Sequence, residues 1–455
     1  MQQSNSKVHA EMEIVNAHAA GIDVGSRSHF VAIGQSADDV KEFGCYTADL
    51  HELCKFLKSA GMTSVAMEST GNYWQSLFVM LQDYALNPIL VNGKFTKNVK
   101  GRKSDVQDCQ WIQKLHTLGL LEGSFLPDLF TEELRIYSRH RQTLIADGGA
   151  YIQKIQQALR RANIRLDIAI KDVTGVSGKA IIEAILAGER DPATLAGLAN
   201  FRIKKSKEEI AKSLTGNWRE EYLFELKQCY EIYKYFHLRI ADCDKEIEKI
   251  LERKIAENER VDGEQRLEFK GKKSGKNKND LGFDLQKMSF QLTSGIDLSA
   301  IEGVNVGTIM TIISEVGLDL SAFSTAKQFA SWLHLTPNNK ISGGKVLSSR
   351  TVKGKNRLAK ALRHAANTIG TTVKTGALHH FYKRIAYRKG GIQAVTATAH
   401  KLSIIIWNML TKKEAYKPIE QEKYLSSIRE NQLKVIQKKI KLLNILPDEL
   451  QFCTT

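Results

Sequence analysis

The chain has 455 residues, of which 42% are hydrophobic and only six are proline, which is typical of a folded globular protein of two or three domains and excludes a disordered chain. No apolar run reaches the roughly 18 residues that a membrane span needs. The six cysteines form no CxxC pair, and the first residues are acidic where a signal peptide would be apolar. We therefore expect a cytoplasmic protein with neither a zinc site nor a disulfide framework.

Basic residues are concentrated in the later part of the chain, which has a formal net charge of +16. Residues 1–125 hold 11 Lys and Arg against 13 Asp and Glu, so the remaining 330 residues carry the whole excess of positive charge. Between Asp319 and Glu414 there is no acid in 94 residues, but there are 17 Lys and Arg. This favours a nucleic-acid partner, bound through its phosphates, over a membrane surface. The expected location is the bacterial nucleoid, with no membrane partner.

Strand and helix patterns alternate from Gly21 to about Gly123. Apolar alternation predicts five strands, at residues 21–26, 29–34, 40–47, 63–69 and 87–92. Amphipathic spacing predicts helices at residues 48–61, 72–85 and 104–121. Three strands in a meander followed by alternating helices and strands is the order of the ribonuclease-H-like fold. Residues 15–125 are therefore predicted to form an α/β domain of this type.

Long helices are predicted in the middle of the chain, over residues 126–258. Thr131 is a plausible N-cap for the first, which continues to about residue 162. The second follows Trp218 and repeats in alternating four- and three-residue steps at Leu226, Tyr230, Tyr233, His237, Ile240, Asp244, Ile247 and Leu251. Such helices can pair within one chain or between chains, so this region is expected to be a helical coiled coil that supports oligomers. Residues 259–290 are expected to be a basic flexible insertion.

The third region, residues 291–415, is predicted to be mostly α-helical, with a helical tail at 416–455. The segment "IDLSAIEGVNVGTIMTIISEVG", residues 296–317, is similar to a helix-hairpin-helix with its turn at Gly303 and Gly307. In that motif the backbone amides of the turn face a phosphate and no base is recognised. A turn that only caps a helix is the alternative interpretation.

Four acids are expected to come together in the first domain. Asp23 lies in the first predicted strand and Glu68 ends the fourth, while Asp105 and Asp108 share one face at the start of a helix. In a ribonuclease-H-like sheet the first and fourth strands are adjacent, and the last helix packs across their ends. Four converging carboxylates repel one another unless cations neutralise them, which favours Mg²⁺ or Mn²⁺, two ions per site about 4 Å apart. Taken singly, each acid also has an ordinary role as a turn, surface or helix-start residue.

Several segments together resemble a known family. "GIDVGSRSHFVAI", "MESTGNYWQSL", "GRKSDVQDCQWIQKL", "FASWLHLTPNNKISGGK" and "RTVKGKNRLAKALRHAAN" are similar to the Piv-like DEDD transposases and invertases of bacterial insertion sequences, whose N-terminal domain is RuvC-like. The resemblance covers most of residues 19–370 in the family's order. It implies cutting and rejoining of donor and target DNA through a C-terminal serine. It also implies homo-oligomers, dimers or tetramers, and in some members a guide RNA from the same element.

Transferred to this chain, the resemblance indicates Ser342 in "NNKISGGK" as the nucleophile, with Ser348 and Ser349 as competitors that spacing does not exclude. The flanking glycines let the backbone approach a phosphate. A serine hydroxyl is a weak nucleophile, so metal ions at the carboxylates would have to activate the reaction, which would form a phosphoserine link to DNA. The basic side chains expected to bind nucleic acid are Lys345, Arg350, Lys353, Lys355, Arg357 and Arg363.

These observations predict an enzyme, a DNA transposase or recombinase. The main alternative is a RuvC-like, metal-dependent junction resolvase that hydrolyses DNA with water and forms no covalent intermediate. A sugar-kinase-like ATPase also has a "GIDVGS" strand, but it needs a second Asp-Gly loop late in the chain, where the acid-free stretch supplies none. A nucleic-acid-binding regulator without catalysis is the remaining alternative.

Overall fold

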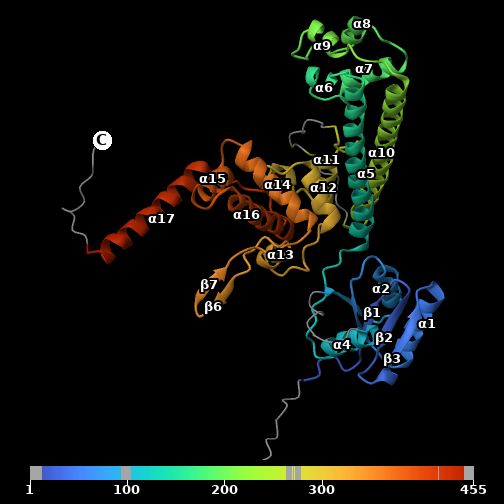
Figure 1. The fold of residues 1–455 in the computed structure, drawn as a ribbon. Coiled ribbons are helices and arrows are strands. Elements are labelled where there is room, and N and C mark those ends of the chain that lie inside the picture. Colours follow the sequence, from blue (N-terminus) through green and yellow to red (C-terminus); the bar gives the residue numbers. More distant parts are fainter. Residues whose placement is uncertain are drawn as a thin grey trace, which may run out of the picture. The chain divides into compact units, whose positions relative to one another are not determined.

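The computed structural model describes residues 13–93, 104–262, 278–418 and 420–444, together with Phe269 and Gly271. The chain divides into two compact units, Met1–Leu126 and Pro127–Thr455 (Figure 1). Within the described part of the chain, no helix is both long and apolar enough to cross a membrane.

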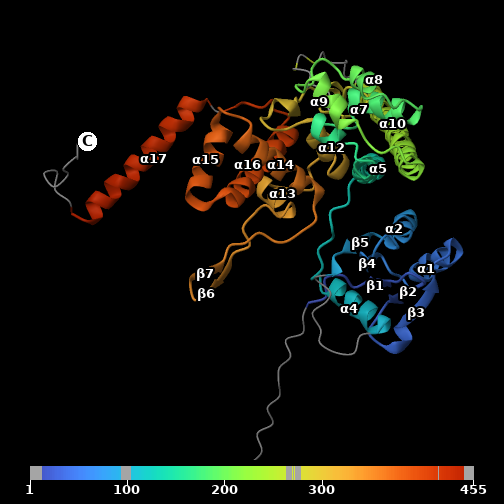
Figure 2. The same cartoon turned by 45° about the horizontal axis from the view of Figure 1, so that its top comes forward.

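The first unit is built on a five-stranded mixed sheet. Its strands are β1 (Ala19–Val24), β2 (Ser28–Ala32), β3 (Val40–Gly44), β4 (Ser64–Glu68) and β5 (Pro88–Val91), in the spatial order β3-β2-β1-β4-β5 (Figure 2). The β1–β2 and β2–β3 pairs are antiparallel, whereas β1–β4 and β4–β5 are parallel. The predicted mixed α/β sheet is therefore confirmed, with β1 and β4 adjacent as expected.

Helices cover both faces of this sheet. The core between the sheet and α1 (Thr47–Ser59) and α2 (Trp74–Asp83) contains Ile22 of β1 and Met67 of β4, both fully buried. The opposite face of β1 packs against α4 (Asp105–Thr117). A short 3-10 helix, η1 (Ala37–Asp39), links β2 to β3. Alternate residues of β1 thus face two different layers.

Two long helices lie side by side in the second unit, α5 (Leu129–Arg161) and α10 (Glu220–Asp262). Between them the chain forms α6 (Leu166–Ala169), α7 (Val176–Leu186), α8 (Pro192–Gly197) and α9 (Lys207–Ser213). The predicted seam of α10 is buried, apart from a half-buried His237. The pairing occurs within one chain, which is one of the two arrangements that the sequence allowed.

The predicted start of the first long helix is wrong. α5 begins at Leu129, and its N-cap is Asp128, whose carboxylate accepts a hydrogen bond of 2.8 Å from the backbone N–H of Thr131. Both residue types are good N-caps, but a cap accepts from the amide two or three residues further on. Thr131 is therefore the capped residue and not the cap.

The remaining elements of the second unit form a mostly helical domain, as predicted. They are α11 (Leu285–Leu292), η2 (Leu298–Ala300), α12 (Val306–Glu315), α13 (Ala326–Trp332), α14 (Arg357–Thr371), α15 (Ala377–Lys389), α16 (Gly391–Lys412) and α17 (Gln421–Leu442). Between α13 and α14 lies a two-stranded hairpin, β6 (Lys340–Ser342) and β7 (Lys345–Ser348), which projects from the helices (Figures 1 and 2).

A buried carboxylate connects three helices of this unit. Glu315, at the end of α12, is 8% exposed and accepts hydrogen bonds of 2.9 and 2.6 Å from Arg139 of α5. The guanidinium of Arg135 lies 3.8 Å from the same carboxylate, and that of Arg357, at the start of α14, lies 3.9 Å away. Glu315 therefore holds α12 and α14 against the helical pair.

Replacing Glu315 with alanine is expected to lower the free energy of unfolding by about 3 kcal/mol, because it removes the buried carboxylate that neutralises Arg135, Arg139 and Arg357. The matched control is Glu133→Ala, which removes an ion pair with Arg253 between exposed side chains. That change should cost less than about 1 kcal/mol. Urea unfolding of both variants measures the difference, and equal losses would contradict a structural role for Glu315.

Candidate active site

Two of the predicted acids occupy equivalent positions on neighbouring strands. Asp23 follows Ile22 in β1 and Glu68 follows Met67 in β4, and Ile22 and Met67 are partners in the parallel register. Both side chains are half-buried. The carboxyl ends of parallel strands are where open α/β sheets place their ligand sites. The two carboxylates therefore meet at the expected edge of the sheet.

The other two acids lie in the first turn of α4. Ser104 is the N-cap and accepts a hydrogen bond of 3.3 Å from the backbone N–H of Gln107, so the helix begins at Asp105. Asp105 is exposed, whereas Asp108 is half-buried. Acids in the first turn of a helix interact favourably with its dipole, which stabilises this start.

Gly21 determines how closely α4 approaches the sheet. A Cβ atom at this position would lie 2.3 Å from the backbone nitrogen of Gln113 and 2.5 Å from the carbonyl oxygen of Cys109. Only glycine permits this contact, because neither backbone atom can move without moving the helix. Gly21 and Asp23 are two residues apart, so both face the α4 side of the strand. The close packing at Gly21 brings the first turn of α4 toward Asp23.

Gly21→Ala is accordingly expected to destabilise the first unit by about 2 kcal/mol, through overpacking against the α4 backbone. Gly123→Ala is the control, since a Cβ there would meet Ile89 at an ordinary contact distance of 3.7 Å. Thermal unfolding of both variants checks the expectation. A Gly21 variant as stable as the control would mean that the contact relaxes at little cost.

The charges of the four acids are coupled. Burial and, after it, the negative charges of Asp105, Asp108 and Glu68 together raise the pKa of Asp23 from 3.8 to about 6. Burial also raises the pKa of the neighbouring Cys109 thiol to about 12, so it stays protonated at neutral pH. The structure thus brings the four predicted acids into one electrostatic cluster centred on Asp23.

The donor atoms of this cluster suit a hard divalent cation. Carboxylate oxygens are preferred by Mg²⁺ and Mn²⁺. A bound cation would offset both the burial and the acidic neighbours that raise the pKa of Asp23. In the described residues, however, no three His, Cys, Asp or Glu side chains are placed closely enough to ligate a single ion. The four acids lie near one another, but their side chains have to rotate before three of them can ligate the same ion.

Ser342 lies at the end of the β6–β7 hairpin. Its register partner is Lys345, and the two residues between them, Gly343 and Gly344, have φ values of +54° and +76°. Two consecutive positive φ values define the type I′ turn that matches the twist of a hairpin, and glycine adopts them without strain. Ser342 and Lys345 are exposed, and as register partners they are adjacent on one face of the hairpin. Ser348, in contrast, accepts a hydrogen bond from the backbone of Arg350.

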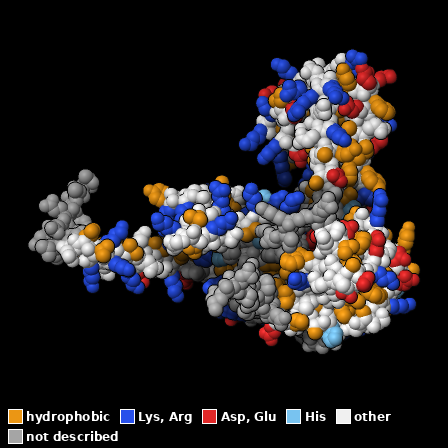
Figure 3. Space-filling model, turned by 60° about the horizontal axis from the view of Figure 1, so that its bottom comes forward, with side chains coloured by type: hydrophobic (Ala, Val, Ile, Leu, Met, Phe, Trp, Pro, Cys, Tyr) orange, Lys and Arg blue, Asp and Glu red, His pale blue; other side chains and the backbone are white. Residues whose placement is uncertain are grey.

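Basic side chains gather over the C-terminal helices. Figure 3 shows Lys and Arg in blue over this region, where the red of Asp and Glu is scarce. Around the start of α14 they line a cavity of about 700 Å³ together with Gln142 and Thr311. The charged or titratable residues that line it are Lys355, Arg357, Lys360, Arg363 and His364. The cavity has the charge and the helix N-terminus that suit a phosphate group.

The basic side chains predicted to bind nucleic acid differ in the contacts that they make within the folded chain. Lys345, Lys353 and Lys355 are exposed. Arg357 donates a hydrogen bond to Gln142 and pairs with Glu315, while Arg363 donates to the carbonyl oxygen of His334 at 3.3 Å. These two arginines therefore also have a structural role.

The two glycines of the predicted phosphate-binding turn also have separate surroundings. Gly303 has a φ of +78°, and a Cβ there would lie 2.7 Å from the carbonyl oxygen of Ala365, so it allows close packing on α14. Gly307 lies in the first turn of α12 and is exposed. The element before the turn is the 3-10 helix η2, and the helix-hairpin-helix stays a prediction.

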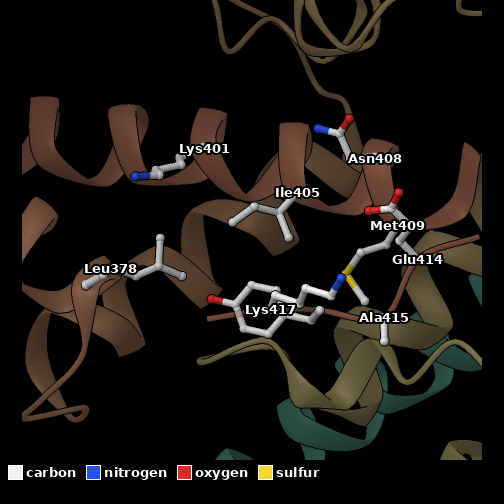
Figure 4. Close-up of a pocket in the computed structure, with 10 residues that line it drawn as sticks. Leu378, Lys401, Ile405, Asn408, Met409, Glu414, Ala415 and Lys417 are labelled. Carbon is white, nitrogen blue, oxygen red and sulfur yellow. The ribbon is translucent and has the colours of Figure 1, made fainter. Parts of the chain in front are cut away.

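A smaller cavity of about 220 Å³ lies between α15, α16 and residues 414–417 (Figure 4). Leu378, Ile405 and Met409 form its apolar lining. Burial and the charge of Arg384 lower the pKa of Lys401, which also lines the cavity. Its volume is below the usual range for ligand pockets, so we assign no ligand to it.

Sequence reasoning missed three features of this site. Gly21 stands inside a strand, where glycine often marks a close backbone approach. The Gly-Gly pair between alternating residues indicates a two-residue hairpin, but the sequence analysis expected a mostly helical domain and did not predict these two strands. Lys360 and His364 follow Arg357 at helical spacing, which places them on the same side of α14.

Comparison with known proteins agrees with these features. Residues 20–164 match a family model described as a transposase, of the DEDD type found in IS110 elements. Residues 297–383 match a second model, described as a transposase of the IS116/IS110/IS902 family. The first match contains all four acids, and the second contains Ser342 and the cavity-lining residues of α14. The class that the sheet and its acidic cluster indicate is thus the DEDD transposases.

Three curated relatives are similar over part of the chain. A probable family 20 transposase of Pseudomonas aeruginosa is 28% identical over 124 residues, 27% of this chain and 36% of the relative. The transposase for insertion sequence element IS1111A of Coxiella burnetii is 31% identical over 123 residues, 26% of this chain and 34% of the relative. A putative transposase of Sinorhizobium fredii is 31% identical over 106 residues, 22% of this chain and 27% of the relative. The matched stretches span about a third of these relatives. The chain belongs to the IS110-type family of DEDD transposases of insertion sequences.

Proposed function

We propose that this protein is a DNA transposase that cuts and rejoins strands at the ends of an insertion sequence. The observation that carries the proposal is the electrostatic coupling of Asp105, Asp108 and Glu68 to Asp23 at the carboxyl edge of a mixed sheet. Charge clusters of this kind are costly to a fold, and function is the usual reason that they persist. The family match supplies DNA as the substrate class.

Asp23, Glu68, Asp105 and Asp108 would hold two Mg²⁺ or Mn²⁺ ions. When bound, such ions polarise a phosphodiester and stabilise the charge on its entering and leaving oxygens. The packing of α4 on Gly21 holds the last two acids near the strand edge, and the burial of Asp23 makes its carboxylate responsive to a cation. The four residues thus act as ligands and not as proton carriers.

Ser342 acts as the nucleophile in this proposal. Its Oγ attacks the scissile phosphorus, an Oγ–P bond forms, and the bond from phosphorus to the leaving deoxyribose oxygen breaks. The serine proton passes to solvent and the leaving oxygen gains a proton, so the phosphodiester is exchanged for a phosphoserine ester. Lys345, its neighbour in the hairpin register, stabilises the charge of the phosphoryl oxygens. The reverse attack by a DNA hydroxyl rejoins the strands.

Lys353, Lys355 and the basic cavity at α14 bind the phosphates of donor and target DNA. A guide RNA that pairs with both DNAs would leave little trace in the protein except positive charge, which this region has. Two observations test guidance by RNA. RNA encoded beside the gene should co-purify with the protein, and its removal with a nuclease should stop DNA cleavage. The paired helices α5 and α10 are the proposed centre of a dimer or tetramer.

The decisive experiment incubates the full chain with Mg²⁺ and end-labelled DNA that contains the element's own termini. Denaturation before electrophoresis then separates covalent protein–DNA complexes from free strands. We expect a covalent complex whose bond maps to Ser342 after proteolysis. The competing proposal, a junction resolvase of RuvC type, predicts Mg²⁺-dependent nicks with no covalent complex. It is favoured only by the acids and leaves the serine hairpin without a role.

A further inference from the structure

The last described helix, α17, joins the C-terminal domain only at its beginning. Tyr424 is 8% exposed, and the cationic groups of Arg384 and Lys401 lie 5.9 and 5.7 Å from the centre of its ring. Just before the helix, the hydroxyl of Tyr416 donates a hydrogen bond of 2.6 Å to Glu302. After Tyr424 the helix extends away from α14, α15 and α16 (Figure 1). Its start is therefore fixed, while most of its length projects beyond the domain.

An apolar stripe runs along this projecting part. Its members are separated by three or four residues, and they are Leu425, Ile428, Ile436, Ile440 and Leu443, with Gln432 as one polar member at the centre. Leu425, Ile436 and Leu443 are 41%, 50% and 66% exposed. A solvated helix does not maintain an apolar face over five turns, so this stripe is expected to be covered by another surface.

The charges of α17 indicate what covers it. Its first half, up to residue 431, is balanced, with Glu422 and Glu430 against Lys423 and Arg429. Its second half holds four lysines, Lys434, Lys438, Lys439 and Lys441, and no acid. Two parallel copies would place the four-lysine halves side by side, which costs energy by like-charge repulsion. Two antiparallel copies place each four-lysine half beside a balanced half.

We propose that α17 pairs antiparallel with α17 of a second copy of the chain, around a two-fold axis at Gln432. That axis sets Ile428 opposite Ile436 and Glu430 opposite Lys434, so the apolar and the charged groups nearest the axis are matched. Gln432 lies opposite its own copy, where two side-chain amides can hydrogen-bond and fix the register. An isologous contact of this kind closes into a dimer and does not grow into filaments. The proposal uses residues outside both transposase matches and is independent of the proposed chemistry.

The test measures self-association of the full chain by sedimentation velocity. Ile436→Lys is expected to raise the dissociation constant of one association step at least about tenfold, because it places a charge in the stripe. Gln437→Lys is the matched control, since it adds the same charge one residue away on the polar face, and it should change association little. Circular dichroism verifies that both variants keep their helix content.

A charge exchange tests the antiparallel direction. Glu430→Lys should weaken association, because Lys then faces Lys434 of the other copy, and Glu430→Lys with Lys434→Glu should restore it. Association that is insensitive to Ile436→Lys, or a double variant no better than the single one, overturns the proposal. A third outcome also overturns it: Ile436→Lys no longer binds vesicles that contain phosphatidylserine but self-associates as the wild type does. Lipid, and not a second copy of the chain, would then cover the stripe.

Discussion

Ser342→Ala is expected to abolish the covalent protein–DNA complex and to reduce strand rejoining by at least about a thousandfold. The variant lacks the oxygen that forms the new bond to phosphorus, and no neighbouring group can replace it in the same geometry. Because Ser342 is exposed at the end of a hairpin, its loss should change the free energy of unfolding by less than about 0.5 kcal/mol. The defect should therefore be chemical and not one of folding. Denaturing electrophoresis with labelled element ends measures it.

Ser348→Ala and Ser349→Ala are the controls for this experiment. Both sit in the same acid-free segment, and Ser348 already bonds to the backbone of Arg350. They should retain the covalent complex. If Ser349→Ala loses it while Ser342→Ala keeps it, the nucleophile has been assigned to the wrong serine. If all three variants cleave DNA normally and none forms an adduct, water is the nucleophile and the resolvase proposal holds.

Asp23→Asn should reduce Mg²⁺-dependent cleavage by about a thousandfold or more, because it removes the central carboxylate of the cluster. The same change should stabilise the metal-free protein at pH 7 by an amount on the order of 1 kcal/mol. This value is smaller than the pKa shift alone would give, because Asp23 is only half-buried and solvent screens its repulsion. A loss of activity with a gain of stability is the signature of a strained functional site.

The pH dependence of this effect follows from the direction of the shift. The folded protein holds a proton on Asp23 up to about pH 6, whereas the unfolded chain releases it near pH 3.8. The folded state thus binds more protons between these values, and wild-type stability falls as the pH rises through that window. The stabilisation by Asp23→Asn should therefore be absent at pH 3.5 and complete at pH 7.

Urea unfolding in EDTA at these two pH values measures the effect. Asp38→Asn, a change at an exposed acid of the same unit, is the control and should show neither change. A stabilisation that is equal at both pH values would contradict an electrostatic origin. Added Mg²⁺ should stabilise the wild type at pH 7 and have less effect on the Asp23 variant.

The first unit was largely predictable from sequence because its signals are local. Alternation in residues 21–47 and the apolar stretches around Met67 and Leu90 are read directly as strands, and the meander order then places β1 beside β4. Asp23 and Glu68 become neighbours through this rule alone. What sequence could not supply is the approach of α4, since nothing local to Gly21 shows that Cys109 and Gln113 will pack on it.

The second unit depends on contacts that sequence spacing does not reveal. The periodicity of α10 showed which residues would be buried, but it could not choose between a partner in the same chain and one in another. Arg357 and Arg363 were interpreted as phosphate ligands from their charge, and their pairing with Glu315 and His334 emerges only from the folded chain. A charge count cannot distinguish a cation that serves the fold from one that serves a ligand.

The turn at Gly343 and Gly344 has a consequence for chirality. No atom lies within 4 Å of a Cβ at either glycine, so backbone handedness alone limits what can stand there. Mirror-image alanine should fit both positions, while ordinary alanine would oppose the turn. If the turn opened and the strands slipped by one residue, Ile341 would take the face that now presents Ser342. The side chain offered to a substrate at this hairpin is thus selected by the handedness of two residues that have no side chains.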